Sequence, residues 1–299
     1  MPVLGLTFTM PRATRVTGKP LFFAPLLAVA LLWALPLAEG VAARDIDAPD
    51  SGATTSTRPI VFDVSYPQCD RALPEAFTFA IVGVNGGRVY SPNPCLGGGA
   101  DEAADASQLR WAGPGVHFYA NTGNPGPRLS RYWPVGQGSP RVCSGDDPDT
   151  ASCAYNYGWN AAADSYANAV AAYVSLELAE ADATRTPTAT TWWLDVETAN
   201  SWRADARLNV AALHGAVDYL ESMDVAGVGF YSAPRMWARI TGGTDAFAAY
   251  PSWVAGASTL DGAQSVCLGD GFTGGHVAMA QYLSGGLDAN VVCRAQDDG

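Results

Sequence analysis

Short runs of apolar residues without regular alternation recur along this chain, and they limit its fold more than any other feature. Such runs are typical of parallel strands that are buried on both faces. Helical or loop sequence separates them, so we predict an α/β protein built as a single modified (β/α)8 (TIM-like) barrel. The eight candidate strands are IVFDVS from Ile60, FAIVGVN from Phe79, GVHFYAN from Gly115, TWWLDVE from Thr191, GVGFYS from Gly227, SWVAGA from Ser252, AQSVCL from Ala263 and VAMAQYL from Val277.

The segments between these runs include candidate helices at 100–112, 156–183, 203–222 and 234–240. Helical sequence is short or absent between the later strands, so we expect the barrel to be irregular there. The segment 122–155 is too long for a plain connection. Its GNPGP motif and its two cysteines predict a structured loop over one end of the barrel.

Residues 1–43 have the pattern of a secretory signal peptide. Basic residues precede an uncharged run over 21–38, and Val41-Ala42-Ala43 supplies the small residues of a cleavage site. An uncleaved anchor is the alternative, because the run is close to the shortest that spans a bilayer. Two prolines in the run favour cleavage, and Met10 is an alternative start of the chain.

Residues 44–58 contain almost no large apolar side chain, which predicts a flexible lead-in. The remaining stretch, 59–299, has the length of one (β/α) barrel domain and contains no second linker. We therefore expect a secreted or cell-envelope protein that is a monomer. It would contact a membrane only if the signal segment were retained.

The charge balance excludes several classes of function. Removal of the signal segment leaves 14 basic and 28 acidic side chains, so nucleic acid is not an expected partner. Lys19 is the only lysine, which excludes a lysine nucleophile, a Schiff base and a P-loop cation in the mature protein. Glycine-rich segments such as VNGGRVY lack the rest of a phosphate-binding motif, so no cofactor is predicted.

All six cysteines follow the predicted cleavage site, and an even number in an exported chain indicates disulfides. We expect neighbours in sequence to pair, because each pair encloses a loop rich in proline or glycine. A zinc site is the alternative, but no CxxC motif occurs and no metal is predicted. The expected bridges are Cys69 with Cys95, Cys143 with Cys153, and Cys267 with Cys293.

The run WWLDVETANSW contains the strongest candidate for a catalytic centre. In a strand, Asp195 and Glu197 point to the same side as Trp193, and we expect that side to be the barrel lumen. The strand is predicted to end at Glu197, and barrels of this class carry their chemistry at the carboxyl ends of strands. Two acids held together there repel each other, which raises at least one pKa.

Two further acids occupy comparable positions. Asp63 lies near the carboxyl end of the first strand, and Asp288 follows the last predicted strand. First and last strands are neighbours in a closed barrel, so both acids could share one bowl with Asp195 and Glu197. The alternative is that single acids at strand ends cap helices or pair with arginine.

Five motifs in order resemble those of the glycoside hydrolase family 25 lysozymes, which cleave bacterial cell-wall glycan on a modified barrel. The chain is also similar to secreted actinobacterial proteins called glycoside hydrolase-like, for which VGVNGG and CAYNYGWNAA are typical. The five motifs are FDVSY at Phe62, WLDVET at Trp193, GFYSAPRMW at Gly229, SWVAGA at Ser252 and AQYLSGGLDAN at Ala280.

The resemblance implies roles for the four acids. Glu197 would be the general acid, and Asp195 would orient an acetamido group or stabilise positive charge. Asp63 and Asp288 would position substrate or water. Such chemistry needs a protonated carboxyl at the leaving oxygen and an anion near the developing oxocarbenium ion. Polar and aromatic residues near strand ends are candidates for contacting the sugar: Tyr119, Asn121, Tyr231, Trp253 and Gln281.

The chain departs from the lysozyme pattern at two strand ends. After the second strand, VGVNGGRVY offers Asn85 and Arg88 where the lysozymes usually carry a lysine and an acid. The third strand ends in FYANTGNP, and His117 is more often a core residue than a base in such a setting. Two hypotheses therefore stay open: a secreted glycosidase, and a non-catalytic glycan-binding or structural barrel of the envelope. Arginines such as Arg88 or Arg235 paired with the acids would favour the second.

Overall fold

The computed structural model describes residues 60–98 and 107–293. The predicted signal peptide at 1–43 and the lead-in at 44–58 lie outside the described residues, as does most of the helix expected at 100–112. Within the described part, no helix combines the length and apolar character needed to cross a membrane.

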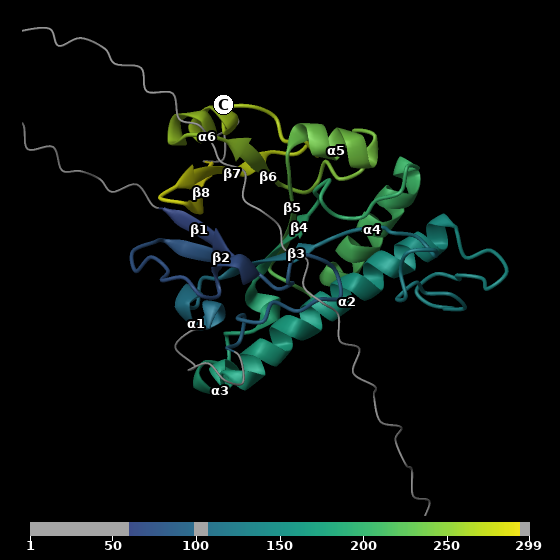
Figure 1. Cartoon of the computed structure of the whole chain (residues 1–299), viewed down its shortest axis with the longest axis horizontal. Coiled ribbons are helices and arrows are strands. Elements are labelled where there is room, and N and C mark those ends of the chain that lie inside the picture. Colours follow the sequence, from purple (N-terminus) through teal and green to yellow (C-terminus); the bar gives the residue numbers. More distant parts are fainter. Residues whose placement is uncertain (1–59, 99–106, 294–299) are drawn as a thin grey trace, which may run out of the picture. The chain divides into compact units, whose positions relative to one another are not determined.

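The strands form one closed barrel in chain order, which confirms the predicted fold class (Figure 1). Neighbouring strands are parallel, except that the last strand is antiparallel to both of its neighbours. The barrel is therefore a modified (β/α)8 barrel. Its strands are β1 (Val61–Val64), β2 (Phe79–Gly83), β3 (His117–Asn121), β4 (Thr191–Asp195), β5 (Gly227–Ser232), β6 (Ser252–Ala257), β7 (Val277–Ser284) and β8 (Leu287–Val292).

One predicted strand is wrong. The run AQSVCL lies largely in helix α6 (Leu260–Val266), whose first turn is capped by Thr259: its hydroxyl accepts a hydrogen bond from the amide of Gly262. The eighth strand is instead β8, which a tight turn through Gly285 and Gly286 joins to β7. This hairpin explains the antiparallel direction, because a short turn cannot connect parallel strands.

The remaining helices surround the barrel and follow the expected order. They are α1 (Gln108–Ala112), α2 (Ala151–Ser175), α3 (Leu178–Ala181), α4 (Ala206–Ser222) and α5 (Pro234–Thr241), with short 3-10 turns at Tyr66–Gln68 and Pro187–Ala189. The helix predicted at 156–183 starts earlier and is interrupted at Glu177, whose φ of 55° lies in the left-handed region.

Helices α2 and α4 pack side by side (Figure 1). Glycines at the crossing permit the close approach: a Cβ on Gly158 would lie 1.8 Å from the carbonyl oxygen of Ala212, and one on Gly215 would lie 1.9 Å from that of Tyr155. The backbones themselves are therefore in contact at this crossing.

Side chains of β4 alternate between the two sides of the barrel wall, as expected. Trp192 packs outward in the main core beneath the helices, whereas Trp193 lies in the lumen with Trp253 and Met279. Gly229 on β5 leaves room for Trp193, because a Cβ there would lie 2.4 Å from the indole ring. The lumen below the site is thus filled with side chains and provides a rigid floor.

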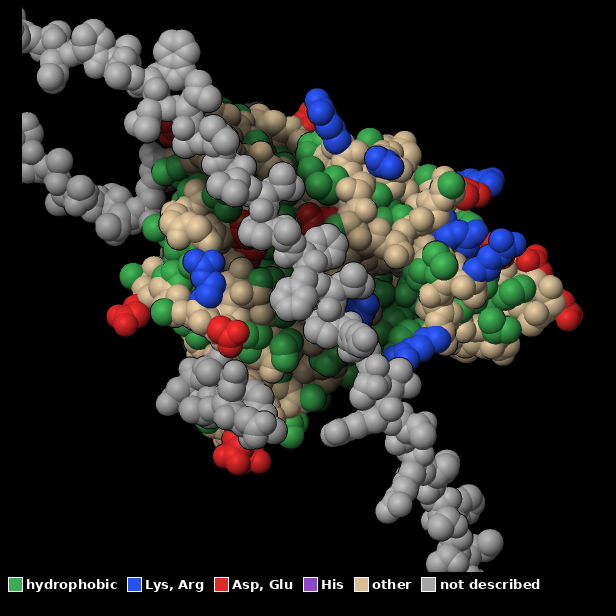
Figure 2. All heavy atoms as spheres, viewed as in Figure 1, with side chains coloured by type: hydrophobic (Ala, Val, Ile, Leu, Met, Phe, Trp, Pro, Cys, Tyr) green, Lys and Arg blue, Asp and Glu red, His purple; other side chains and the backbone are tan. Residues whose placement is uncertain are grey.

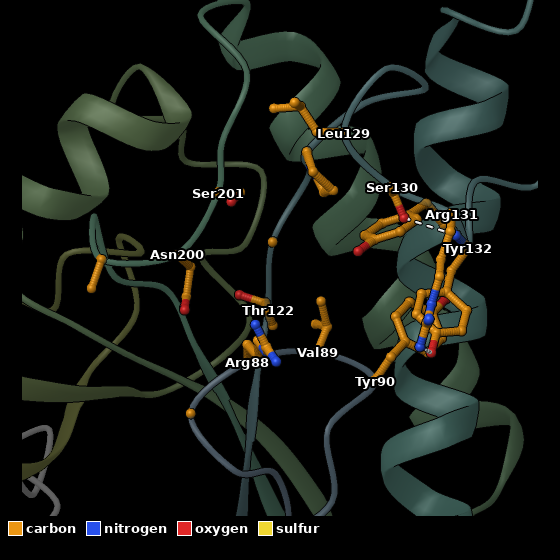
Figure 3. Close-up of a pocket in the computed structure, with 15 residues that line it drawn as sticks. Arg88, Val89, Tyr90, Thr122, Leu129, Ser130, Arg131, Tyr132, Asn200 and Ser201 are labelled. Carbon is orange, nitrogen blue, oxygen red and sulfur yellow. Dashed lines mark hydrogen bonds between the residues drawn. The ribbon is translucent and has the colours of Figure 1, made fainter. Parts of the chain in front are cut away.

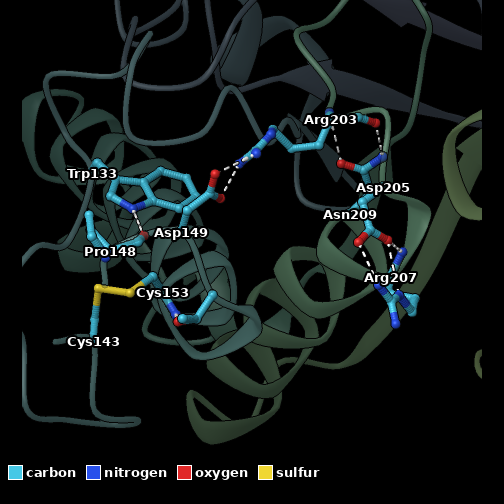
Figure 4. A network of polar contacts seen from close by, with 10 residues as sticks. Trp133, Cys143, Pro148, Asp149, Cys153, Arg203, Asp205, Arg207 and Asn209 are labelled. Carbon is cyan, nitrogen blue, oxygen red and sulfur yellow. Dashed lines mark hydrogen bonds and ion pairs between the residues drawn. A yellow bond between two sulfur atoms is a disulfide. The ribbon is translucent and has the colours of Figure 1, made fainter. Parts of the chain in front are cut away.

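The long segment between β3 and α2 is anchored at several points (Figure 4). The disulfide Cys143–Cys153 ties it to α2, and Asp149 forms an ion pair with Arg203, at 2.5 and 2.7 Å, beside the start of α4. The indole N–H of Trp133 donates to the carbonyl oxygen of Pro148 at 2.6 Å. These contacts make the segment a structured loop over the barrel end.

The other disulfides are Cys69–Cys95 and Cys267–Cys293, so the three bridges connect the pairs expected from the sequence. Each of these two bonds joins segments that are 26 residues apart. The first ties the loop after β1 to the loop after β2, and the second ties the end of α6 to the end of β8. All six thiols are therefore occupied, and none is free to bind zinc.

Candidate active site

An open cavity of about 380 Å³ lies at one end of the barrel, where the carboxyl ends of the parallel strands meet. Figure 2 shows acidic side chains recessed in this face of the molecule. Eight residues singled out from the sequence line the cavity, and they come from seven of the eight strands and from the segment after β4: Asp63, Tyr119, Asp195, Glu197, Tyr231, Trp253, Gln281 and Asp288.

Asp63 on β1 is buried and held by side-chain amides. Asn290 donates to its Oδ2 at 2.7 Å, and Gln281 donates to its two oxygens at 3.1 and 3.2 Å. Burial raises the pKa of Asp63 to about 7, with a further contribution from Asp288, while the amide donors oppose the shift. The carboxyl of Asp63 therefore changes protonation near neutral pH.

Asp195 ends β4 and is also buried. The side-chain amide of Asn121 donates to its Oδ2, and the Thr122 hydroxyl donates to its carbonyl oxygen. Its Oδ1 has no partner among the described residues. Burial raises its pKa well above the usual value and the charge of Glu197 adds to this, while the bond from Asn121 lowers it. These contacts fix the carboxyl in place.

Glu197 lies two residues beyond the end of β4, so the strand is shorter than predicted, yet both acids line the same cavity. The carbonyl oxygen of Glu197 accepts from the indole N–H of Trp202 at 2.7 Å and from the amide of Asn200 at 3.1 Å. Its side chain is half-buried. Burial raises its pKa, and Asp288 contributes. Glu197 is thus an accessible acid that retains its proton to higher pH than an exposed glutamate.

Asp288 lies inside β8 and not after the last strand, as the sequence had suggested. It is paired in register with Asp63. Because β8 is antiparallel, its first residues lie at the same barrel end as the last residues of β1. Burial raises the pKa of Asp288. Asp63 and Asp288 are thus neighbours, as expected, but Asp288 reaches this position on an antiparallel strand.

Hydrogen bonds link the neutral side chains to the acids. The hydroxyl of Tyr231 donates to Oε1 of Gln281 at 2.8 Å, and the indole N–H of Trp253 donates to Oδ1 of Asn290 at 2.7 Å. Both amides therefore have their oxygens occupied, which turns their N–H groups toward Asp63. The hydrogen-bond partners thus determine which way the side-chain amides of Gln281 and Asn290 are oriented.

Some functional positions differ from the sequence-based expectation. Asn121 does not line the cavity, and its contact is with Asp195 instead of a substrate. Asn290 and Thr122 were missed. A polar residue inside a strand of the barrel, as in LDANVV, is a signal that could have identified Asn290. His117 lies away from the cavity beneath Trp193 and Phe79, and burial lowers its pKa to about 4.

The cavity acids are not neutralised by arginine. The ion pairs within residues 60–98 and 107–293 are Arg203–Asp149 and Arg207–Asp205, so neither Arg88 nor Arg235 pairs with a cavity acid there. Carboxyls with raised pKa values around an open cavity can donate a proton to one atom and stabilise positive charge at another. The arrangement is suited to acid-assisted cleavage of a bond in a polar substrate.

These features define a barrel with an acidic cavity at one end, and part of its sequence is similar to lysozymes. The family model described as lysozyme-like protein 1 matches residues 165–262, which include Asp195 and Glu197. The "Probable GH family 25 lysozyme 4" of Dictyostelium discoideum is 34% identical over 100 residues. Residues 165–262 are therefore similar to lysozyme-like proteins, which confirms the resemblance noted in the sequence.

The likeness in sequence is confined to part of each protein. It covers 33% of this chain and 45% of the Dictyostelium protein. Among solved structures, a muramidase from Trichobolus zukalii is 14% identical with a TM-score of 0.46, covering 80% of this chain and 95% of that one. A bacterial lysozyme from Streptomyces coelicolor is 15% identical with a TM-score of 0.44, covering 80% and 94%.

Proposed function

We propose that this protein is a secreted glycoside hydrolase that cleaves glycosidic bonds of a cell-wall or related polysaccharide, with Glu197 as the general acid. The observation that carries the proposal is the convergence of four unneutralised carboxyls, Asp63, Asp195, Glu197 and Asp288, in one open cavity. Burying acids together is costly unless it serves a purpose. The lysozyme-like match over 165–262 supports a glycan as the substrate.

In the proposed reaction, Glu197 protonates the glycosidic oxygen as the bond to the anomeric carbon breaks, and the sugar with the new hydroxyl leaves. Water then bonds to the anomeric carbon and gives up one proton, which restores the proton used by Glu197. Glu197 suits this role because its half-buried position raises its pKa and leaves the carboxyl accessible. Asp195 lies beside it and, once ionised, stabilises the positive charge that develops on the sugar ring. Asn121 holds Asp195 in place, and Asp63 with its amide partners positions water or a sugar hydroxyl.

Export is part of the same proposal. Three disulfides are consistent with an oxidising compartment, and the predicted signal segment at 1–43 supplies a route there. A glycan of the cell envelope is a substrate that such a protein can reach.

The test is a hydrolysis screen of the mature protein against purified peptidoglycan and other envelope polysaccharides, with release of reducing ends as the readout. Glu197→Gln removes the acid while keeping the side-chain size, and we expect it to lower kcat by at least about a hundredfold. Glu180→Gln, an exposed position on α3, is the matched control and should retain full activity. Equal turnover by wild type and Glu197→Gln would show that Glu197 is not the general acid.

A non-catalytic glycan-binding barrel is the other outcome of this screen. In that case no substrate is turned over, and sedimentation with insoluble cell walls shows binding that Glu197→Gln leaves unchanged. Failure both to cleave and to bind any glycan would contradict the two functions together.

A further inference from the structure

A second cavity lies next to the acidic one and has the opposite character. Its volume is about 610 Å³, within the range of sites that hold small molecules. Among the described residues that line it there is no aspartate or glutamate, although the chain is strongly acidic, while Arg88 and Arg131 both line it. Its walls come from the segment after β2, the loop after β3 and the segment after β4.

The two cavities share a wall. Thr122 lines the second cavity, and its hydroxyl donates to the carbonyl oxygen of Asp195, which lines the first. Asn200 also lines the second cavity, and its backbone N–H donates to the carbonyl oxygen of Glu197. The two cavities are therefore neighbours, and hydrogen bonds join the residues of one to the residues of the other.

Neither arginine in this cavity is neutralised by a carboxylate within the described residues. Arg203, by contrast, lines a different pocket and donates two hydrogen bonds to Asp149 there. In Figure 3, Arg88 and Arg131 lie in different parts of the cavity, and Arg131 lies against Tyr132. The positive charges of Arg88 and Arg131 are thus available to a ligand.

Aromatic rings hold one of these charges in place. The guanidinium carbon of Arg131 lies 4.7 Å from the ring centroid of Tyr132, and its Nη2 donates to the Tyr132 hydroxyl at 2.5 Å. Tyr90 stacks on Tyr132 with centroids 4.1 Å apart. The loop that carries Arg131 is anchored by the Cys143–Cys153 disulfide. Contacts with Tyr132, which itself stacks on Tyr90, therefore hold the guanidinium of Arg131 in place.

The wall retains unused polar groups. The Tyr90 hydroxyl and Nδ2 of Asn200 are buried with no hydrogen-bond partner in the described part of the chain, and buried polar atoms are paired in most proteins. Tyr90 also has a φ of 58°, and a left-handed conformation is uncommon for a tyrosine. Strained and unpaired residues of this kind concentrate where ligands bind.

We propose that this cavity is an anion subsite, and that the polysaccharide cleaved at the acidic cavity carries a carboxylate or phosphate group that binds Arg88 and Arg131. The inference rests on the proposed glycosidase function and narrows its substrate to an acidic glycan. The unneutralised arginines contact the anion, and the tyrosine pair contacts the sugar that bears it. The arginines also keep an acidic ligand from being repelled by an acidic protein.

Binding is measured in the Glu197→Gln background, so that no probe is consumed. The probes are an oligosaccharide of alternating glucuronate and N-acetylglucosamine, the same oligosaccharide with its carboxyls reduced to alcohols, and a phosphorylated chitooligosaccharide. The variants are Arg88→Gln and Arg131→Gln. Arg239→Gln on α5 is the matched control, because Arg239 is exposed and lines neither cavity.

We expect at least one anionic probe to bind about tenfold more tightly than the reduced probe, and each cavity variant to lose about tenfold, as for a charge-assisted hydrogen bond. Arg239→Gln should bind like its parent. Preference for the glucuronate or the phosphorylated probe identifies the source of the anion. Equal binding of charged and reduced probes, insensitivity to both variants, or no binding of either anionic probe overturns the proposal.

Hydrolysis by the protein with Glu197 intact separates this inference from the proposed function. If the protein cleaves a neutral glycan and Arg88→Gln does not change the rate, the glycosidase function is supported and the anion subsite is refuted. If an anionic probe binds in a way that depends on the arginines but no glycan is cleaved, the anion subsite is supported and the glycosidase function is refuted.

Discussion

Asp63→Asn is expected to make the protein less stable than the wild type at pH 4 and more stable at pH 8. Burial and Asp288 raise the pKa of Asp63 from 3.8 to about 7 in the folded protein. A carboxyl whose pKa is higher in the folded state costs stability when it ionises. The cost is absent below pH 4, grows between pH 4 and pH 7, and is constant above. Asparagine does not ionise and avoids it.

The magnitude follows from the shift and from the neighbours of Asp63. Each pKa unit corresponds to about 1.4 kcal/mol, so raising the pKa from 3.8 to about 7 costs about 4 kcal/mol at pH 8. In the Asp63→Asn variant, however, the new side-chain NH₂ group faces the N–H donors of Gln281 and Asn290. Gln281 and Asn290 cannot turn to accept, because Tyr231 and Trp253 occupy their oxygens. That conflict costs about 1–3 kcal/mol at every pH.

Urea unfolding followed by tryptophan fluorescence at pH 4, 6 and 8 gives the free energy of unfolding of both proteins. The difference between variant and wild type should shift by about 4 kcal/mol in favour of the variant from pH 4 to pH 8. Asp147→Asn, in the exposed loop before α2, is the matched control and should follow the wild type. Parallel curves for Asp63→Asn and wild type would refute a raised pKa at Asp63.

Three further predictions concern activity and the frame of the barrel. Activity should decline as pH rises through the raised pKa of Glu197, and the falling limb of kcat against pH should lie above the range in which an exposed glutamate titrates. Gly158→Ala should lower the free energy of unfolding by about 1–3 kcal/mol or more, because its methyl group meets the backbone of Ala212, and thermal melts measure this. Replacing Cys267 and Cys293 by alanine should cost about 3 kcal/mol, measured by urea unfolding, because their bond closes a long loop.

Most strands could be predicted because a buried parallel strand needs a continuous apolar run. Two segments were assigned wrongly: AQSVCL, which is helical, and LDANVV, which forms β8. AQSVCL is apolar enough for a strand, but Thr259 caps a helix just before it. The strand β8 was missed because its lumen side carries Asp288 and Asn290 in place of apolar residues, although the Gly-Gly pair before it is typical of a hairpin turn.

The acids of the site could be predicted for a different reason. Alternation along β4 places Asp195 on the lumen side with Trp193, and closure of the barrel brings β1 next to the last strand. The amides could not be assigned in this way. Asn121 looked like a residue that contacts substrate, yet it binds Asp195, since the distance between neighbouring strands suits an amide and a carboxylate. Side-chain pairing across strands depends on register, which a single sequence does not fix.

The separation of charges between the two cavities is difficult to explain by stability alone. Four acids with raised pKa values line one cavity, and a wall that includes Thr122 separates it from the next. Two arginines line that next cavity, and neither pairs with a carboxylate in the described part of the chain. Pairing arginine with the acids would stabilise the folded protein, and it would also lower the pKa that a proton donor needs. Keeping Arg88 and Arg131 apart from Glu197 preserves the acid at one cavity and the positive charge at the other. A substrate that carries its own anion at some distance from the bond to be broken can use both.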